Sequence, residues 1–201
     1  MKSKDARQRL LDGAIDYVAR TGISDLSLRT LASGLGTSHR MLIHHFGSKE
    51  GLWVEIVRTV EQRQRDLLGD LLPDPEAEFG EGMRVWWRHI SDSSLWANER
   101  LFFEIYGQAI QGRAHTTAVL DGIVDDWVQP IAELTIARGV PADVATAHAR
   151  LGVAVTRGLL LDLVATGNVE AVDAAMEAFI DVYEAWIARA AQAAGTQAAD
   201  R

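Results

Sequence analysis

Apolar residues recur three and four positions apart along nearly the whole chain, which is the period of an α-helix. In the first such segment, Leu10, Leu11, Ala14, Ile15 and Val18 follow this spacing, and Gly22 ends it. We find no pair of segments with the alternation expected of paired strands. The pattern therefore predicts an all-α protein of about nine helices.

Two short helices and a long one follow the first segment. Leu28, Leu31, Ala32 and Leu35 form the buried face of a helix that Asp25 or Ser27 caps, and Gly36 suits the left-handed conformation of a tight turn. Ser38 caps the next helix, which runs to His45 and ends at Gly47. Ser48 caps a long helix to about Leu71, where Pro73 and Pro75 break the chain.

The remaining sequence predicts five more helices. They cover residues 76–92, 95–111, 116–138, 141–166 and 169–191, and the third is expected to bend at Pro130. The three-helix segment predicts a helix-turn-helix DNA-binding domain over residues 1–53. The rest predicts a larger helical domain with a dimerisation surface over residues 54–193, followed by a flexible tail over 194–201.

Charge is distributed unevenly between these two parts. The net charge is −8, but residues 1–53 hold eight Lys or Arg against five Asp or Glu, whereas residues 54–201 hold 12 against 23. A basic head on an acidic body directs one end of the molecule towards phosphates. The chain has no Cys, no signal-peptide pattern and no long apolar run, so we expect neither disulfides nor a membrane span, and a location in the cytoplasm.

The second short helix, residues 38–45, is the expected recognition helix. A helix-turn-helix places this helix in the major groove of double-stranded DNA. Arg40 is the best candidate for a bidentate contact with guanine, His39 for a base acceptor and Met41 for a thymine methyl group. The remaining candidates on this surface, several of them for phosphate contacts, are Ser27, Arg29, Thr37, Ser38, His44 and His45.

Residues 27–53 resemble the N-terminal domain of the TetR/AcrR-type family of ligand-responsive transcriptional repressors. The resemblance rests on one ungapped pattern, formed by Ser27, Leu31, Ala32, Gly36, Ser38, Leu42, Phe46, Ser48, Lys49, Glu50 and Leu52. It implies a cytoplasmic homodimer that binds a palindromic operator and is released by a small-molecule effector. It also implies that Lys49 contacts a phosphate.

Two positions depart from the family pattern. Thr37 stands where the family usually has Val, and Ile43 stands where it usually has Tyr. In the family that Tyr hydroxyl commonly meets a DNA phosphate, so one backbone contact is missing here, and His45 is a candidate to replace part of it.

A single recognition helix touches few base edges, so two copies related by a two-fold axis are expected to read the operator. The last two long helices offer a seam for pairing two copies. The candidate interface residues are Leu151, Val155, Gly158, Val172, Met176, Phe179, Tyr183 and Trp186. The alternative is that this stripe faces the chain's own core.

Aromatic residues are dense between positions 83 and 131. Bulky aromatics at helical spacing are typical of a core, but the family resemblance implies an effector cavity in these helices. The candidate lining residues are Trp86, His89, Phe103, Tyr106, Gln108, Trp127 and Arg157. Such a cavity favours an apolar or aromatic small molecule.

Catalysis is not expected. The sequence has no nucleophile elbow, no P-loop and no H-E-x-x-H pattern, and adjacent His44 and His45 point to different faces of a helix. We therefore expect no metal and no cofactor. Two rival functions stay open: a DNA-binding activator without a ligand, and a helical module whose helix-turn-helix contacts another protein.

Overall fold

The computed structural model describes residues 2–22, 26–71 and 78–199, and it is all-helical over these ranges. They contain nine α-helices, α1 to α9, and two short 3₁₀ helices, η1 and η2, and no strand. The predicted fold class is confirmed. By packing, the chain divides into two compact units: residues 1–63 with 92–121, and residues 64–91 with 122–201. The division falls inside α4.

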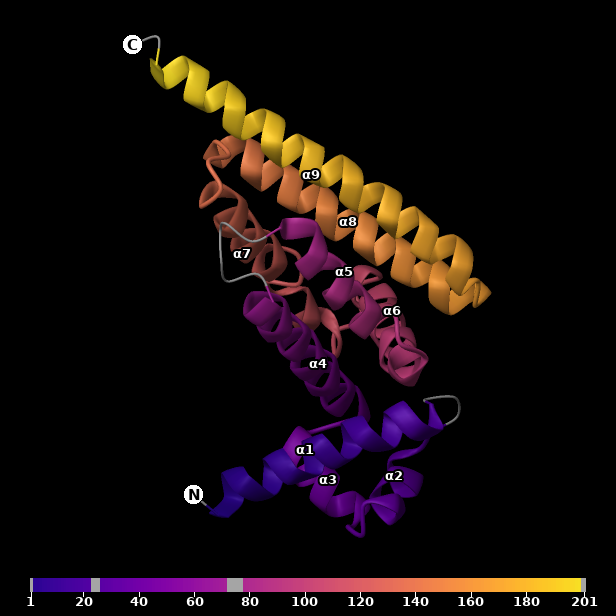
Figure 1. Ribbon diagram of the computed structural model, residues 1–201. Helices are drawn as coiled ribbons and strands as arrows, with labels where there is room; N and C mark the ends of the chain where they lie inside the picture. Colours follow the sequence, from indigo (N-terminus) through magenta and orange to yellow (C-terminus); the bar gives the residue numbers. More distant parts are fainter. Residues whose placement is uncertain (1, 23–25, 72–77, 200–201) are drawn as a thin grey trace. The chain divides into compact units, whose positions relative to one another are not determined.

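The first unit contains the predicted three-helix head. Helices α1 (Lys2–Thr21), α2 (Leu28–Gly34) and α3 (His39–Phe46) precede the start of α4 (Lys49–Leu71), as Figure 1 shows at the indigo end of the chain. Its core consists of buried apolar side chains that the helical spacing places on the inner faces: Leu11, Ala14, Ile15, Val18, Leu28, Leu31, Ala32, Leu42, Phe46, Leu52, Trp53 and Ile56. Short helices such as α2 and α3 depend on this packing, because they are too short to be stable alone.

A second set of helices completes the first unit. Helices η1 (Ser93–Leu95), α6 (Trp96–Ile110) and η2 (Thr117–Leu120) follow one another, and α6 packs against both α1 and η2. Leu101 and Ile105 lie in the buried face of α6. The guanidinium of Arg58, on α4, donates a hydrogen bond to the carbonyl oxygen of Ala118 in η2.

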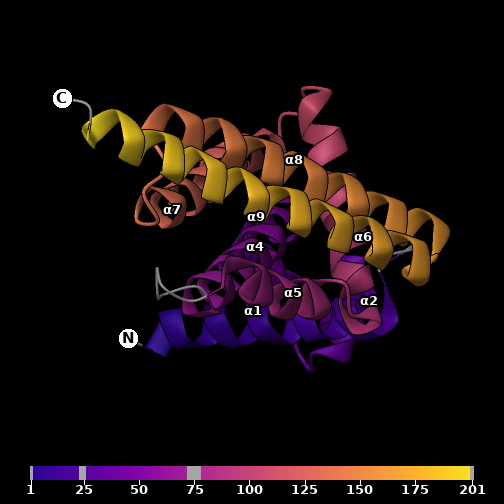
Figure 2. The same cartoon turned by 45° about the horizontal axis from the view of Figure 1, so that its top comes forward.

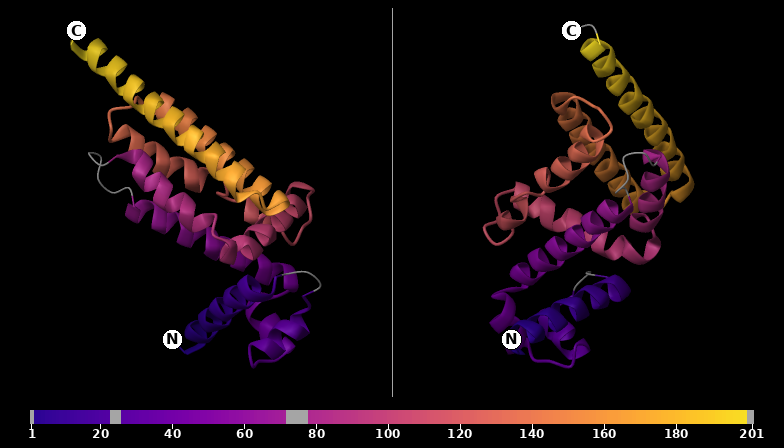
Figure 3. Two further views of the ribbon diagram at one scale, coloured as in Figure 1. Left: turned by 45° about the vertical axis from the view of Figure 1, so that its right-hand side comes forward. Right: turned by 60° about the vertical axis from the view of Figure 1, so that its left-hand side comes forward.

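The second unit is built on a pair of long helices. Helices α8 (Ala142–Thr166) and α9 (Val169–Ala199) run antiparallel, and Gly167 reverses the chain between them with a left-handed φ of 69°. They lie side by side in every view (Figures 1 to 3). Helix α7 (Asp125–Ile136) packs against α8, and α5 (Phe79–Ile90) packs against α9. Trp86, Trp127, Leu163, Met176 and Ile180 are among the buried side chains.

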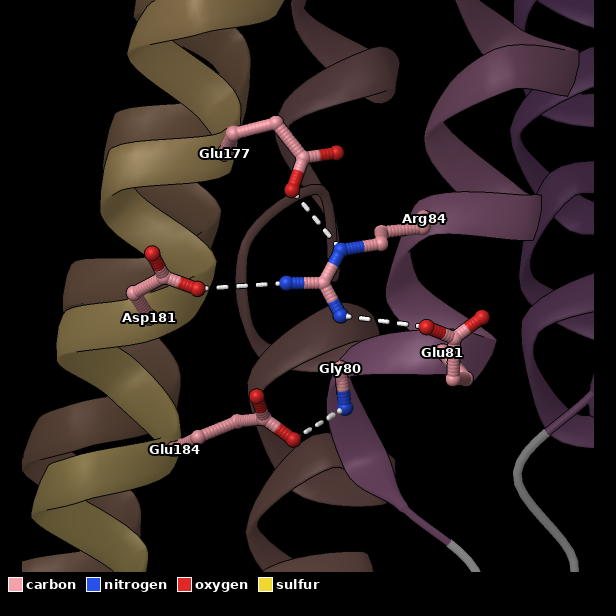
Figure 4. Close-up of polar contacts among 6 residues, drawn as sticks. All are labelled: Gly80, Glu81, Arg84, Glu177, Asp181 and Glu184. Carbon is pink, nitrogen blue, oxygen red and sulfur yellow. Dashed lines mark hydrogen bonds and ion pairs between the residues drawn. The ribbon is translucent and has the colours of Figure 1, made fainter.

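One arginine on α5 pairs with two carboxylates on α9 and with a third on α5 itself. Arg84 donates to Glu177 at 2.7 Å and to Asp181 at 3.1 Å on α9, and to Glu81 at 3.4 Å one turn back on α5 (Figure 4). The hydrogen bond that Arg84 donates to Glu177 raises the pKa of Arg84 above its ordinary value, because the bond favours the charged guanidinium. One turn further along α9, Glu184 accepts a hydrogen bond from the backbone N–H of Gly80 at 2.8 Å.

The hydrogen bond between the Gly80 N–H and Glu184 caps the N-terminus of α5. Glu78 precedes the helix but makes no capping bond with its side chain, so Glu184 satisfies one of the unpaired N–H groups at the start of α5. The contact is close: a Cβ on Gly80 would lie 2.5 Å from the carboxylate of Glu184. Only glycine therefore fits at this position without a shift of the neighbouring side chain.

Two predicted helix limits are wrong. The helix expected over residues 116–138 is divided into η2 and α7, because Gly122 adopts a left-handed φ of 72° between them. Pro130 lies inside α7. The last helix does not end near Ala191 but continues to Ala199. Residues Asp25, Pro73 and Pro75, to which the sequence assigned a cap and a chain break, lie outside the described residues.

The division into units differs from the predicted domains, which placed a boundary after residue 53. That boundary concerns function, and it stays a prediction. Among the described residues, no helix is both long and apolar enough to cross a membrane.

Candidate nucleic-acid interface

Two capping serines and two glycines set the limits of α2 and α3. Ser27 caps α2 by accepting a hydrogen bond from the N–H of Thr30 at 3.1 Å, and Ser38 caps α3 in the same way from Met41 at 3.2 Å. Gly36, with a φ of 63°, turns the chain between the helices, and Gly47, with a φ of 78°, ends α3. These backbone conformations favour glycine, which has no Cβ. The local sequence thus fixes the limits of α3.

The outer face of α3 is polar and exposed. His39, Arg40 and His44 are exposed, and the side chain of Met41 is 41% exposed. Leu42 and Phe46 on the opposite face are buried. Arg40 makes no hydrogen bond or ion pair with any residue that the structure describes, so its planar guanidinium is available to an external partner. This is the face that the sequence predicts to meet base edges.

His45 differs from the other predicted contacts. Its side chain is half-buried beside the rings of His44, at 5.1 Å between centroids, and Phe46, at 6.2 Å. Its Nε2 atom is buried and has no hydrogen-bond partner among the described residues. His45 therefore does not share the fully exposed face of α3 that the sequence assigned to it.

The remaining candidates lie around the ends of α2, α3 and α4. Ser27, Arg29 and Ser38 are exposed, and Thr37 is half-buried. Lys49 is the first residue of α4, and its ammonium group lies 5.8 Å from the centroid of the Trp53 ring. The hydroxyls of Ser27 and Ser38 are already used as caps. Whether any of these groups contacts DNA stays a prediction.

Sequence reasoning missed one residue of this region, Arg7 on α1. Its Nε donates to the carbonyl oxygen of His45 at 3.4 Å, its Nη2 pairs with Glu55 at 2.9 Å, and its guanidinium lies 5.1 Å from the centroid of the Phe46 ring. Arg7 and His45 are 38 positions apart. No short motif indicates a contact between residues so far apart in the sequence. The sequence analysis therefore included Arg7 only in the count of positive charges.

The candidate effector residues are divided between the two units. Trp86, His89, Trp127 and Arg157 belong to the second unit, and Phe103, Tyr106 and Gln108 belong to the first. Trp86 and Trp127 are buried with ring centroids 5.6 Å apart, which is the packing of a core. Arg157 donates to the carbonyl oxygen of Ile123, and His89 is exposed.

The candidates in the first unit lie along α6. Phe103 and Tyr106 are half-buried and stack around Phe102, at 5.1 Å and 5.4 Å between ring centroids. Gln108 donates to Glu104 one turn earlier, at 3.2 Å. Whether any of these seven residues meets a ligand stays a prediction.

The candidate dimer residues split into buried and accessible groups. Val172, Met176 and Tyr183 are at most 3% exposed, so they pack in the chain's own core, which was the alternative that the spacing left open. Val155, Phe179 and Trp186 are half-buried. Leu151 and Gly158 are exposed, and they belong to a row on α8 with spacing 4, 3, 4, 3, 4 in which every member is exposed and uncharged: Ala147, Leu151, Ala154, Gly158, Leu161 and Ala165.

A matching row lies on α9. Ala171, Ala175, Ala178, Val182 and Ala185 are spaced 4, 3, 4, 3, and all are exposed. The second unit therefore carries an exposed uncharged row of small and aliphatic side chains on each of two helices, α8 and α9, that lie side by side. A surface of this kind suits close packing against other helices.

Residues 10–56 match the family of bacterial regulatory proteins named tetR. The chain is 30% identical over 84 residues to the HTH-type transcriptional repressor AcnR of Corynebacterium glutamicum, and the match covers 37% of this chain and 45% of AcnR. The chain thus matches less than half the length of this curated relative.

Solved structures extend the likeness in fold to nearly the whole chain. A transcriptional regulator from Rhodococcus sp. Rha1 has a TM-score of 0.68 and 18% identity, covering 93% of this chain and 96% of the other. The multidrug binding protein EbrR, solved in complex with ethidium, has a TM-score of 0.64 and 24% identity, covering 88% of this chain and 97% of the other. At these identities the likeness establishes the shared fold alone.

Proposed function

Because residues 10–56 match the TetR family of bacterial regulatory proteins, we propose that the chain is a dimeric transcriptional repressor that binds a palindromic operator through α3 and is released by a small-molecule effector. The family consists of transcription regulators rather than enzymes. The observation that carries the proposal is the exposed outer face of α3, whose His39, Arg40 and His44 project from a helix anchored by buried Leu42 and Phe46.

The chemistry of this face suits the major groove. Arg40 matches the O6 and N7 acceptors of guanine, and Met41 offers an apolar contact for the methyl group of thymine. Lys49, Arg29 and the exposed N-terminal ends of α2 and α3 suit phosphates, because helix N-termini present unpaired N–H groups and partial positive charge. These residues support the proposed binding to double-stranded DNA, and the proposed location of the protein is the cytoplasm.

The exposed uncharged rows on α8 and α9 support the dimeric part of the proposal. The uncharged rows on α8 and α9 can associate with the same rows of a second copy to form a four-helix interface. Two copies of α3 related by the two-fold axis would then read half-sites about 34 Å apart.

The proposed release by a small-molecule effector assigns effector binding to the helices that follow the three-helix head. EbrR, which shares this fold, has been solved with ethidium bound. A ligand that binds one arrangement of the helices more tightly than the other shifts the population away from the DNA-binding arrangement. We propose that displacement of the long helix α4 transmits the shift, because α4 begins directly after the recognition helix.

Selection of genomic DNA fragments by the purified protein tests this function. The expected result is one enriched palindrome whose half-sites are about one helical turn apart. Binding to that fragment should weaken as salt rises, because each phosphate contact releases counterions. A protein that stays monomeric and enriches no fragment at low ionic strength is not this regulator.

A further inference from the structure

Arg7 makes three different contacts with the segment that contains the recognition helix. From α1 it donates to the backbone carbonyl of His45, lies over the ring of Phe46 and pairs with Glu55 on α4. His45 and Phe46 are the last two residues of α3, and Glu55 lies on the helix that follows. One planar guanidinium thus connects α1, the end of α3 and α4.

The end of α3 needs such a partner. The last carbonyl groups of a helix have no N–H partner within the helix, and they carry partial negative charge. Gly47 bonds back to Ile43 and Ser48 bonds back to Phe46, whereas the carbonyl of His45 is met by Arg7. Because α3 has only eight residues, its direction depends on contacts with neighbouring helices.

We propose that Arg7 is a positioning residue for α3: its guanidinium, oriented by Glu55, holds the last turn of the recognition helix in the direction that base contacts require. This inference rests on the proposed function. The alternative role for Arg7 is that of a surface cation that attracts DNA phosphates. The two roles predict different responses to substitution.

Global stability does not separate the two roles, but it serves as a control. The side chains of Arg7 and Glu55 are 37% and 36% exposed, and ion pairs at such exposure contribute little to folding. The melting temperature of each variant should therefore stay within about 4 °C of the parent protein. A loss of DNA binding at unchanged melting temperature then reports a change in α3.

Glu55→Gln should change DNA affinity in opposite directions for the two roles of Arg7. Removing a negative charge beside a DNA-binding surface should strengthen binding to any duplex if electrostatic attraction alone matters. If Glu55 orients Arg7, the same substitution should weaken binding to the selected fragment. Arg7→Lys adds a second test. Lysine keeps the positive charge, but it lacks the planar guanidinium that bonds to His45 and Glu55 while it lies over the ring of Phe46.

Asp16→Asn is the matched control. Asp16 is exposed on α1, and it makes no hydrogen bond or ion pair within residues 2–22, 26–71 and 78–199. The substitution Asp16→Asn removes one negative charge from the same unit without disturbing the contacts of Arg7. It should change binding to specific and mixed-sequence DNA by the same factor.

The experiment measures the affinity of all four proteins for the genomically selected fragment and for a mixed-sequence duplex. Arg7→Lys and Glu55→Gln are each expected to lower the ratio of specific to mixed-sequence affinity at least about fivefold, which corresponds to the loss of one base contact. Asp16→Asn should leave that ratio unchanged. The proposal is overturned if Arg7→Lys keeps the ratio, or if Glu55→Gln behaves as Asp16→Asn does.

Hydrogen exchange separates this inference from the proposed function. Amides in the last turn of α3 should exchange faster in Arg7→Lys and Glu55→Gln than in the parent protein, with no change in Asp16→Asn. This result needs no DNA. If the parent protein enriches no DNA fragment, the proposed function fails, and unchanged exchange in α3 would independently remove the positioning role of Arg7.

Discussion

Tyr183 illustrates what burial does to a single polar group. Its side chain is 3% exposed, its ring stacks on Phe79 at 5.4 Å between centroids, and its hydroxyl has no hydrogen-bond partner among the described residues. Burial raises the pKa of the Tyr183 phenol above its ordinary value, because the phenolate would lose its hydration. The phenol is therefore neutral at any physiological pH.

This raised pKa predicts a loss of stability at alkaline pH. Above about pH 10 the unfolded chain releases the Tyr183 proton and the folded chain retains it, so the free energy of unfolding falls by about 1.4 kcal/mol per pH unit from this group. Below pH 10 the group contributes no pH dependence. Tyr183→Phe should remove this part of the slope, as measured by urea denaturation between pH 8 and pH 11.

At neutral pH the same substitution should be neutral or stabilising by about 1 kcal/mol, because it removes a buried hydroxyl that bonds to nothing. Parallel stability curves for Tyr183→Phe and the parent protein above pH 10 would show that this phenol ionises as easily in the folded chain as in the unfolded one.

Arg40 and Lys49 belong to different kinds of contact in the proposed interface. Arg40 lies on the exposed face of α3, whereas Lys49 begins α4. Arg40→Ala should cost about 1–3 kcal/mol of binding free energy for the selected fragment and relax base preference at one position.

Lys49→Ala should weaken binding to every sequence and reduce the slope of log affinity against log salt concentration by about one. Titration against specific and scrambled fragments distinguishes them, and equal loss of specificity in both variants contradicts the assignment.

At the scale of elements, the start of α4 is fitted closely to the end of α3. Ser48 caps α4 by accepting from the N–H of Gly51 at 2.9 Å, and a Cβ on Gly51 would overlap the carbonyl oxygen of Phe46. Further along the same helix, a Cβ on Gly69 would meet nothing within 4 Å. The two glycines therefore allow a matched comparison.

Gly51→Ala should destabilise the protein by about 1–3 kcal/mol, because backbone must move to accept the methyl group. Gly69→Ala should stabilise it by about 0.5–1 kcal/mol, since alanine restricts the unfolded chain and favours helix. Thermal denaturation followed by circular dichroism measures both. Two changes of the same sign would mean that the junction of α3 and α4 is not as closely packed as described.

The contact between α5 and α9 combines a buried part with an exposed ionic part. Trp87 is buried and donates from its ring nitrogen to Asp173 at 2.8 Å, whereas the carboxylates that face Arg84 are more than half exposed. Exposed ion pairs are weakened by water and salt. Burial of the aromatic rings therefore holds α5 on α9, and the ion pairs of Arg84 fix its position along α9.

A double-mutant cycle tests this contact. Arg84→Gln and Glu177→Gln should each lower stability slightly, and the second change should cost less once the first is present. The effect should shrink in high salt. Glu170→Gln, an exposed substitution in the first turn of α9, should show no coupling to Arg84→Gln. Additive changes for Arg84 and Glu177 would mean that their ion pair is absent in solution.

At the scale of the whole molecule, the proposed dimer depends on the exposed uncharged rows of α8 and α9. Leu151 and Leu161 are 43% and 49% exposed, and they belong to one row of exposed uncharged side chains on α8 rather than being scattered singly. Burial of both rows against a second copy would remove this apolar surface from water. In the proposed dimer, DNA specificity would come from two heads acting together rather than from a single head.

Leu151→Glu should shift the protein from dimer to monomer, because it would place a charge inside the packed helices. Ile136→Glu on α7 is the control, since Ile136 has a similar exposure of 41% and lies outside both rows. Sedimentation velocity gives the oligomeric state, and the monomeric variant should lose affinity for the palindrome. If both variants behave alike, the dimer uses another surface.

The sequence by itself determined most of the local structure. Helical periodicity located the helices, and Ser27, Ser38, Gly36 and Gly47 set the limits of α2 and α3, because caps and left-handed turns depend on neighbouring residues only. It also indicated the resemblance of residues 27–53 to the TetR family, which residues 10–56 match, and the face of α3 expected to meet DNA. It did not find the break at Gly122, because glycine is tolerated inside some helices and breaks others.

Only the tertiary structure decided which members of a stripe are buried and which residues far apart in sequence meet. Val172, Met176 and Tyr183 belong to the same stripe as the half-buried Phe179 and Trp186, but they are covered by the chain's own helices. Arg7 meets the end of α3 across 38 positions. Periodicity gives the faces of one helix, whereas the partner of each face depends on how several helices pack at once, and that information is not local in the chain.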